Sequence, residues 1–127
     1  MSPRAAGATQ HELSRIGLLA TLPGETLARL APRMRREEIA AGTGVVAEGD
    51  DGDRFYVVLS GMFAVKQLRN VEPRRYLRPG DYFGEVALAM DIPRTASVRA
   101  LTPATVASCD RETFDELVRP LFADDAA

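Results

Sequence analysis

Hydrophobic residues change their spacing along the chain, and this change divides it into three parts. Near the N-terminus they recur at helical intervals, first at Leu13 and Ile16 and then at Leu27 and Leu30. In the middle they form short alternating runs separated by glycines, which is typical of short strands joined by tight turns. Near the C-terminus the helical spacing returns. The pattern predicts helices over 9–34, about eight short strands over 35–109 and a helix over 110–122.

Capping and breaking residues mark the ends of the predicted helices. Thr9 and Glu12 have the spacing of a capping box at the start of the first helix. Asp110 is a good N-cap for the last helix, which Pro120 should end or kink near Arg119. The apolar face of this last helix consists of Phe114, Leu117, Val118, Leu121 and Phe122. We expect this face to dock on the strands.

Length and composition indicate one small domain. The 127 residues suffice for one hydrophobic core. No apolar run reaches the length of a membrane span, and the N-terminus lacks the apolar core of a secretory signal. The single cysteine excludes an internal disulfide, so we expect a cytoplasmic location. Residues 1–8 are expected to form a disordered leader, and residues 123–127 a short tail.

The charges argue against nucleic acid as a partner. The chain has 16 basic and 18 acidic residues and a net charge of −2, whereas nucleic-acid binders usually carry a basic surplus. Its one basic run, Arg33, Arg35 and Arg36, is followed directly by Glu37 and Glu38. We interpret this run as a solvated surface.

The residue types that most enzymes need are scarce. The single histidine, His11, opens a predicted helix, and the single cysteine, Cys109, ends a predicted strand. A His-based metal site or a Cys–His nucleophile pair is therefore not expected. Asp50, Asp51 and Asp53 lack the distal glutamate of a calcium loop and are interpreted as a solvated turn. The sequence predicts no enzyme, no metal and no cofactor.

The segment from Arg78 to Ala100 contains the clearest candidates for ligand-binding residues. It is predicted to contain a strand, a turn at Gly84, a short helix, a break at Pro93 and another strand. Exposed N–H groups at the start of a helical turn attract anions. Arg94 at the start of the second strand offers a planar fork for a phosphate, and Glu85 can accept hydrogen bonds from sugar hydroxyls. This set suits a small molecule that has both a phosphate and a ribose hydroxyl.

The same segment resembles the cyclic nucleotide-binding domain of bacterial catabolite activator proteins, cyclic-nucleotide-dependent kinases and cyclic-nucleotide-gated channels. The specific part is Phe83-Gly-Glu-Val-Ala-Leu, four residues, and then Pro93-Arg-Thr-Ala-Ser-Val98. The glycines and apolar run over 41–61 are similar to the early strands of that family, and the resemblance extends over 12–122. It implies a mostly β fold with flanking helices, a double-stranded β-helix or jelly roll.

The resemblance also implies a role for each residue of the segment. Glu85 accepts from the ribose 2′-hydroxyl, and Arg94 pairs with the exocyclic oxygens of the cyclic phosphate. The backbone N–H groups of Ala87 and Thr95 complete the phosphate cradle, and the Thr95 hydroxyl can reach the phosphate or a syn guanine. The choice between cAMP and cGMP as the ligand is therefore left open, with cAMP favoured. The expected ligand-binding residues are Gly84, Glu85, Val86, Ala87, Arg94 and Thr95.

The C-terminus departs from the family pattern. Members of the family usually continue into a long helix over the base and, in transcription factors, into a helix-turn-helix. Here Pro120 and the short tail leave room for neither. We therefore expect no DNA binding by this chain alone, and a lid that comes from another chain or from Leu121 and Phe122. Without a lid, we expect weaker affinity and poorer discrimination between purines.

Two functions follow as hypotheses. The first is a regulatory module that binds a 3′,5′-cyclic nucleotide and signals to an attached or partner effector by moving its terminal helices. The alternative is a nucleotide-insensitive interaction domain of the same fold, which would self-associate, for example as a homodimer, through the last helix. An enzyme is the least favoured reading, because a phosphodiesterase or a cupin-type oxygenase needs clustered metal ligands.

Overall fold

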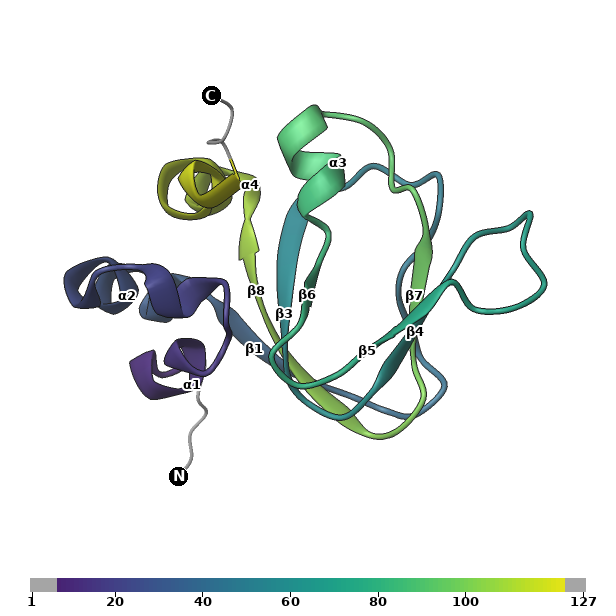
Figure 1. Ribbon diagram of the computed structural model, residues 1–127, viewed down its shortest axis with the longest axis horizontal. Helices are drawn as coiled ribbons and strands as arrows, with labels where there is room; N and C mark the ends of the chain where they lie inside the picture. Colours follow the sequence, from purple (N-terminus) through teal and green to yellow (C-terminus); the bar gives the residue numbers. More distant parts are fainter. Residues whose placement is uncertain (1–6, 123–127) are drawn as a thin grey trace.

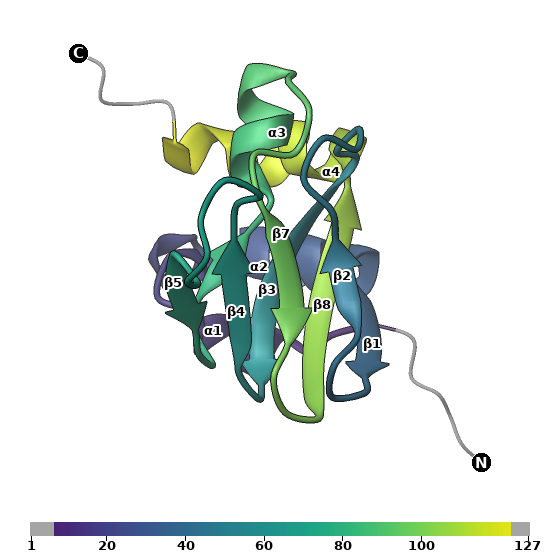
Figure 2. The ribbon, with the colours of Figure 1, turned by 90° about the vertical axis from the view of Figure 1, so that its right-hand side faces the viewer.

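The computed structural model describes residues 7–122, which form two antiparallel sheets facing one another (Figure 1). Within this range there are eight strands, as the glycine pattern predicts. The strand order is β1-β8-β3-β6 in the first sheet and β2-β7-β4-β5 in the second, which Figure 2 shows face-on. The strands are β1 (Arg35–Ile39), β2 (Gly44–Val46), β3 (Arg54–Ser60), β4 (Phe63–Lys66), β5 (Arg75–Leu77), β6 (Tyr82–Phe83), β7 (Ser97–Ala100) and β8 (Ala104–Asp110).

Strand β3 is buried on both faces because it lies between two cores. Phe55 and Val57 belong to the core shared with the helices, while Tyr56 and Val58 belong to the core between the sheets. Successive side chains of a strand point to opposite faces, so one strand can serve both. The apolar residues of β3 therefore connect the helices to the interior of the roll.

The N-terminal helices cover the outer side of the first sheet (Figure 1). They are α1 (Gln10–Ser14), a 3₁₀ turn (Leu19–Thr21), α2 (Gly24–Leu30) and a second 3₁₀ turn (Ala31–Arg33). The predicted capping box is confirmed: Glu12 N–H donates to Thr9 Oγ1 at 3.0 Å, and Thr9 N–H to Glu12 Oε1 at 3.0 Å. Among residues 7–122, no helix has the length and apolar character needed to cross a membrane.

The expected leader is held in place at its last two residues. Ala8 is buried and its N–H donates to the Met34 carbonyl at 3.3 Å, and Gly7 forms a bridge with Arg35. These contacts differ from the predicted disorder, because the chain reaches the start of β1 before α1 begins. Residues 1–6 and the tail 123–127 lie outside the described residues.

The C-terminal helix continues past the proline that was expected to end or kink it. Asp110 caps it as predicted, accepting from Thr113 N–H at 2.9 Å. The helix begins as α4 (Arg111–Thr113), widens to a π-helical turn (Phe114–Val118) and tightens to a 3₁₀ turn (Arg119–Phe122). In the wide turn, Arg119 N–H donates to the Phe114 carbonyl. Pro120 has no N–H to donate, so the helix accommodates it by changing geometry.

The basic run near β1 finds its partners far away in the sequence. Arg33 pairs with Glu116 at 3.0 Å, and Arg36 pairs with Glu12 at 3.2 Å. The adjacent Glu37 and Glu38 are exposed on β1. The two arginines therefore join β1 and the preceding turn to the first and last helices, whereas the sequence suggested that the neighbouring glutamates balanced them.

Candidate ligand-binding site

The segment after β6 folds in the predicted order of strand, glycine turn and short helix. Gly84 has a φ of 95°, a left-handed conformation, and α3 (Glu85–Met90) begins directly after it. A Cβ at Gly84 would lie 2.8 Å from Arg94 Nη1 and 2.9 Å from the Arg54 carbonyl oxygen. Both the backbone conformation and the space therefore require glycine at this position.

All six residues predicted for the site line one pocket of about 210 Å³. The pocket lies beside the start of α3, which sits across one end of the two sheets (Figure 1). Val65 of β4 and Val98 of β7 form part of its apolar wall. The structure thus brings together residues from α3 and from the stretch before β7. Those six residues are Gly84, Glu85, Val86, Ala87, Arg94 and Thr95.

Arg94 is the most unusual residue of the pocket, because its guanidinium is buried without a carboxylate. The residue is 6% exposed. Its Nη2 donates to the Arg54 carbonyl at 2.9 Å, its Nη1 to the Gly84 carbonyl at 3.3 Å, and the Tyr56 ring lies 5.9 Å from Cζ. Among the described residues, none of the ion pairs includes Arg94.

This environment leaves the Arg94 charge poorly compensated. Burial lowers the pKa of its guanidinium, and Tyr56, Asp53 and Glu85 oppose that shift from a distance. A buried charge is expensive unless it is paired and fully hydrogen-bonded. An anion in the pocket would supply the missing charge.

Arg94 also lies earlier than the strand start at which it was predicted. Strand β7 begins at Ser97, and Arg94 lies in the segment that precedes it. The backbone there is fixed by two hydrogen bonds of 2.8 Å: Arg94 N–H donates to the Asp50 carbonyl, and Gly49 N–H donates to the Arg94 carbonyl. The turn before β3 therefore holds the backbone of the arginine.

Gly52 in that turn has a role that the sequence did not reveal. It is buried, and a Cβ there would lie 2.6 Å from the Ala87 Cβ and 3.0 Å from Arg94 Cζ. Asp51 and Asp53 on either side are exposed, as expected for a solvated turn. In the part of the chain that the structure describes, no cluster of His, Cys, Asp or Glu could hold a metal ion.

Glu85 occupies the first position of α3 and is half-buried in the pocket wall. Burial raises the pKa of its carboxyl, while a hydrogen bond from its own backbone N–H and the charges of Arg75 and Arg94 lower it. An anionic carboxylate accepts hydrogen bonds but donates none. It therefore suits a hydroxyl-bearing part of a ligand next to the group held by Arg94.

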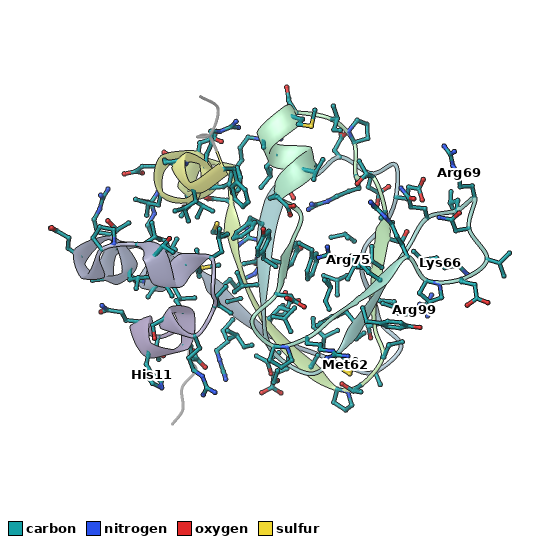
Figure 3. The ribbon with its side chains drawn as sticks, in the orientation of Figure 1. His11, Met62, Lys66, Arg69, Arg75 and Arg99 are labelled. Atoms are coloured by element: carbon teal, nitrogen blue, oxygen red, sulfur yellow. The ribbon has the colours of Figure 1, made fainter. Side chains whose placement is uncertain are left out.

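Sequence reasoning missed Arg75, which also lines the pocket. It lies opposite Val65 in the register of β4 and β5 and lies between the two sheets in Figure 3. The signal was present in the alternation of β5, because Arg75 shares a face with Leu77, which is buried in the inter-sheet core. Arg75 adds a second cation near Glu85.

A jelly roll with a short helix over a basic pocket defines a small-molecule-binding domain. The model of the cyclic nucleotide-binding domain family matches residues 36–120, and the chain belongs to this family. The family and the jelly-roll fold that the sequence suggested are thereby confirmed.

The chain is similar to fungal proteins described as cAMP-dependent protein kinase regulatory subunits. It is 39% identical to that of Eremothecium gossypii over 109 residues, covering 86% of this chain and 24% of the relative. It is 38% identical to that of Emericella nidulans over 109 residues, covering 86% and 26%. The chain therefore spans about a quarter of the length of these relatives.

Solved structures of regulatory subunits share the fold of this chain. The structure of cAMP-bound PfPKA-R matches with a TM-score of 0.83 at 26% identity, covering 88% of this chain and 39% of that one. The regulatory domain of Toxoplasma gondii protein kinase A with cAMP matches at 0.81 and 29%, covering 88% and 44%. A regulatory subunit from Trypanosoma brucei, described as belonging to a cAMP-independent kinase, matches at 0.83 and 24%, covering 87% and 40%. The fold alone therefore does not decide the ligand.

Proposed function

We propose that this chain is a regulatory module that binds a 3′,5′-cyclic nucleotide, with cAMP favoured over cGMP, and is not itself an enzyme. The observation that carries the proposal is Arg94, a cation buried in the pocket and held by carbonyls alone. A cyclic phosphate would add the charge that the guanidinium lacks, in a setting where water screens the attraction little.

The remaining pocket residues suit the rest of the nucleotide. The backbone N–H groups of Ala87 and Thr95 would donate to the phosphate beside Arg94, with Gly84 and Val86 lining the cradle. The Glu85 carboxylate would accept from the ribose 2′-hydroxyl. The base would then extend between the sheets along the apolar wall of the pocket.

The purine preference depends on two opposing arguments. The relatives named above are cAMP-dependent or bound to cAMP, which favours adenine. Arg75, however, has only donors, and the guanine edge with O6 and N7 has only acceptors, whereas the adenine edge has a donor at N6. We infer that cAMP binds more tightly than cGMP and that Arg75 reduces the difference between the two affinities.

The contacts of the last helix provide a path from the pocket to an effector. Arg119 donates to the Leu88 carbonyl at 3.0 Å and to the Ala89 carbonyl at 3.1 Å, and Arg111 donates to the Leu88 carbonyl at 3.3 Å. A ligand that shifts α3 would therefore also shift the last helix. Because the relatives are regulatory subunits of a kinase, a protein kinase catalytic subunit is the first effector to test. We propose that this signalling occurs in the cytoplasm.

The surface on which the interaction-domain alternative depended is largely covered. Phe114, Leu117 and Val118 are buried, so the last helix docks on the molecule as expected. The Phe122 ring packs against Phe114 and against Tyr82, which lines the pocket. The fold remains compatible with the interaction-domain alternative, but most of the apolar face proposed for self-association is buried within the molecule.

Calorimetric titration of the purified chain with cAMP and with cGMP tests the proposal. Arg94→Ala should weaken binding of both by about 2–5 kcal/mol, because a desolvated phosphate loses its charge partner. Arg78→Ala, which truncates an exposed arginine of a turn, is the matched control and should bind normally. Near-normal affinity in Arg94→Ala would refute the assigned role. No heat and no thermal stabilisation of the unaltered chain with either nucleotide would favour the interaction domain.

A further inference from the structure

Strands β4 and β7 present a second hollow on the face opposite to the ligand pocket. Alternation sends Val65 and Val98 inward, where they line the pocket, and sends their neighbours outward. The outward face lies beneath the loop 67–73, which projects from the roll between β4 and β5 (Figure 1). Loop and strands border an open hollow of about 700 Å³. Its lining includes Ala64, Lys66, Leu68, Val71, Ser97 and Arg99.

Three cations gather at this hollow, one from each of its sides. Lys66 comes from β4, Arg69 from the loop and Arg99 from β7, and Figure 3 shows them on the same flank of the molecule. None of the three takes part in the ion pairs found within residues 7–122. Arg99 Nη1 donates to the Gly42 carbonyl at 2.8 Å, which leaves its other N–H groups for a partner.

Two nearby carboxylates, Glu48 and Glu72, offset this basic group only in part. Glu48 Oε1 accepts from Leu68 N–H at 2.7 Å, so this carboxylate is engaged in holding the loop. Glu72 is exposed on the loop itself. Three cations, Lys66, Arg69 and Arg99, against these two carboxylates leave the hollow with one net positive charge, on a chain whose net charge is −2. We call it the basic hollow.

The loop also holds two large apolar side chains in water. Leu68 is 84% exposed and Val71 is 87% exposed. The start of the loop is anchored, because Gln67 Nε2 donates to the Thr95 carbonyl at 3.0 Å and Leu68 N–H donates to Glu48 Oε1 at 2.7 Å. Apolar side chains displayed on an anchored loop beside unpaired cations are typical of an interaction surface.

We propose that the basic hollow is a docking site for an acidic protein segment, in which carboxylates flank an apolar side chain. The carboxylates would pair with Lys66, Arg69 and Arg99, and the apolar side chain would pack on Leu68 and Val71. Charge complementarity selects an acidic partner. The concave shape favours an inserted protein segment over a flat bilayer, and three cations on an acidic chain are too few for nucleic acid. No residue that lines this hollow also lines the ligand pocket, although the two sites lie on opposite faces of β4 and β7 and Gln67 joins the loop to Thr95.

Titration of the ¹⁵N-labelled chain with a short peptide of alternating Glu, Asp and Leu tests the proposal. Amide shifts should concentrate at residues 66–73 and 97–99, and the affinity should fall as salt is added. Reversing the charge of Lys66, Arg69 and Arg99 to Glu should weaken peptide binding about tenfold or more, since each exposed pair contributes modestly. The matched control reverses three exposed arginines elsewhere, Arg15, Arg35 and Arg78.

Each outcome decides the proposal. Localised shifts that the first triple variant abolishes and the control triple retains would support it, provided that both variants melt near the parent temperature. No shifts, shifts elsewhere, or equal loss in both triples would overturn it. Binding of phosphatidylserine vesicles or of duplex DNA at the basic hollow, without binding of the peptide, would also overturn it and assign the surface to that other class.

Discussion

Replacing Gly84 with alanine separates the geometry of the pocket from the general strain of a left-handed residue. Gly84 has a φ of 95°, and an added Cβ would lie 2.8 Å from Arg94 Nη1 and 2.9 Å from a backbone carbonyl oxygen. Gly42 has a similar φ of 87°, but nothing lies within 4 Å of the Cβ it would gain. Gly42→Ala is therefore a control with the same strain and no collision.

The expected magnitudes differ accordingly. A left-handed conformation costs an L-residue about 1–2 kcal/mol, so both variants should lose at least that much free energy of unfolding. At Gly84 the carbonyl of Arg54 belongs to β3 and cannot yield freely, and overpacking of this kind adds about 1–3 kcal/mol. The flexible end of Arg94 must also move, which displaces the guanidinium from the position expected for the phosphate.

Urea denaturation and calorimetric titration with cAMP measure the two effects. Gly84→Ala should be about 1–3 kcal/mol less stable than Gly42→Ala. It should also bind cAMP at least about tenfold more weakly, because the loss of one well-placed charged contact is of that order. Equal stability of the two variants, together with parent-like affinity of Gly84→Ala, would refute the argument that this glycine makes room for Arg94.

Two further changes test separate parts of the structure. Arg75→Met should raise the ratio of cAMP to cGMP affinity about fivefold, because a donor that matches the guanine edge is lost; a ratio that stays constant in competition titrations would contradict this. Asp110→Ala should cost about 1 kcal/mol of stability at neutral pH, since a helix cap is removed. Hydrogen bonds from Thr113 lower the pKa of the Asp110 carboxyl, so its contribution is present above the ordinary Asp pKa and is lost as the pH falls through the lowered value. Melting curves of parent and variant should therefore converge in acid, and a constant gap would contradict the assignment.

Features with local causes could be predicted from the sequence. The capping box at Thr9, the cap at Asp110 and the turn at Gly84 each depend on residues within a few positions of one another. The six site residues fall within a stretch of twelve, 84–95, which the fold needs only to bend into one pocket. Short-range chemistry of this kind is visible before any tertiary structure is known.

Features with distant causes could not be predicted. The carbonyl that holds Arg94 Nη2 belongs to Arg54, forty residues earlier in the chain, and the partner of Arg33 is Glu116. The two faces of β3 pack into two different cores, one of which is completed by helices that lie far away in the sequence. The change of helix type before Pro120 likewise arises from a balance between ring sterics and packing that spacing does not reveal.

The way in which Arg94 is anchored has a practical consequence for any measurement of affinity. Its guanidinium is oriented by two backbone carbonyls, so an arriving anion meets a cation that need not search for a rotamer. Such a fixed charge discriminates by size and shape but little by chemical identity, and sulfate or inorganic phosphate in a buffer becomes a competitor. Apparent dissociation constants for this domain should therefore increase with the concentration of tetrahedral buffer anions, and values obtained in chloride and in phosphate buffers should differ at equal ionic strength.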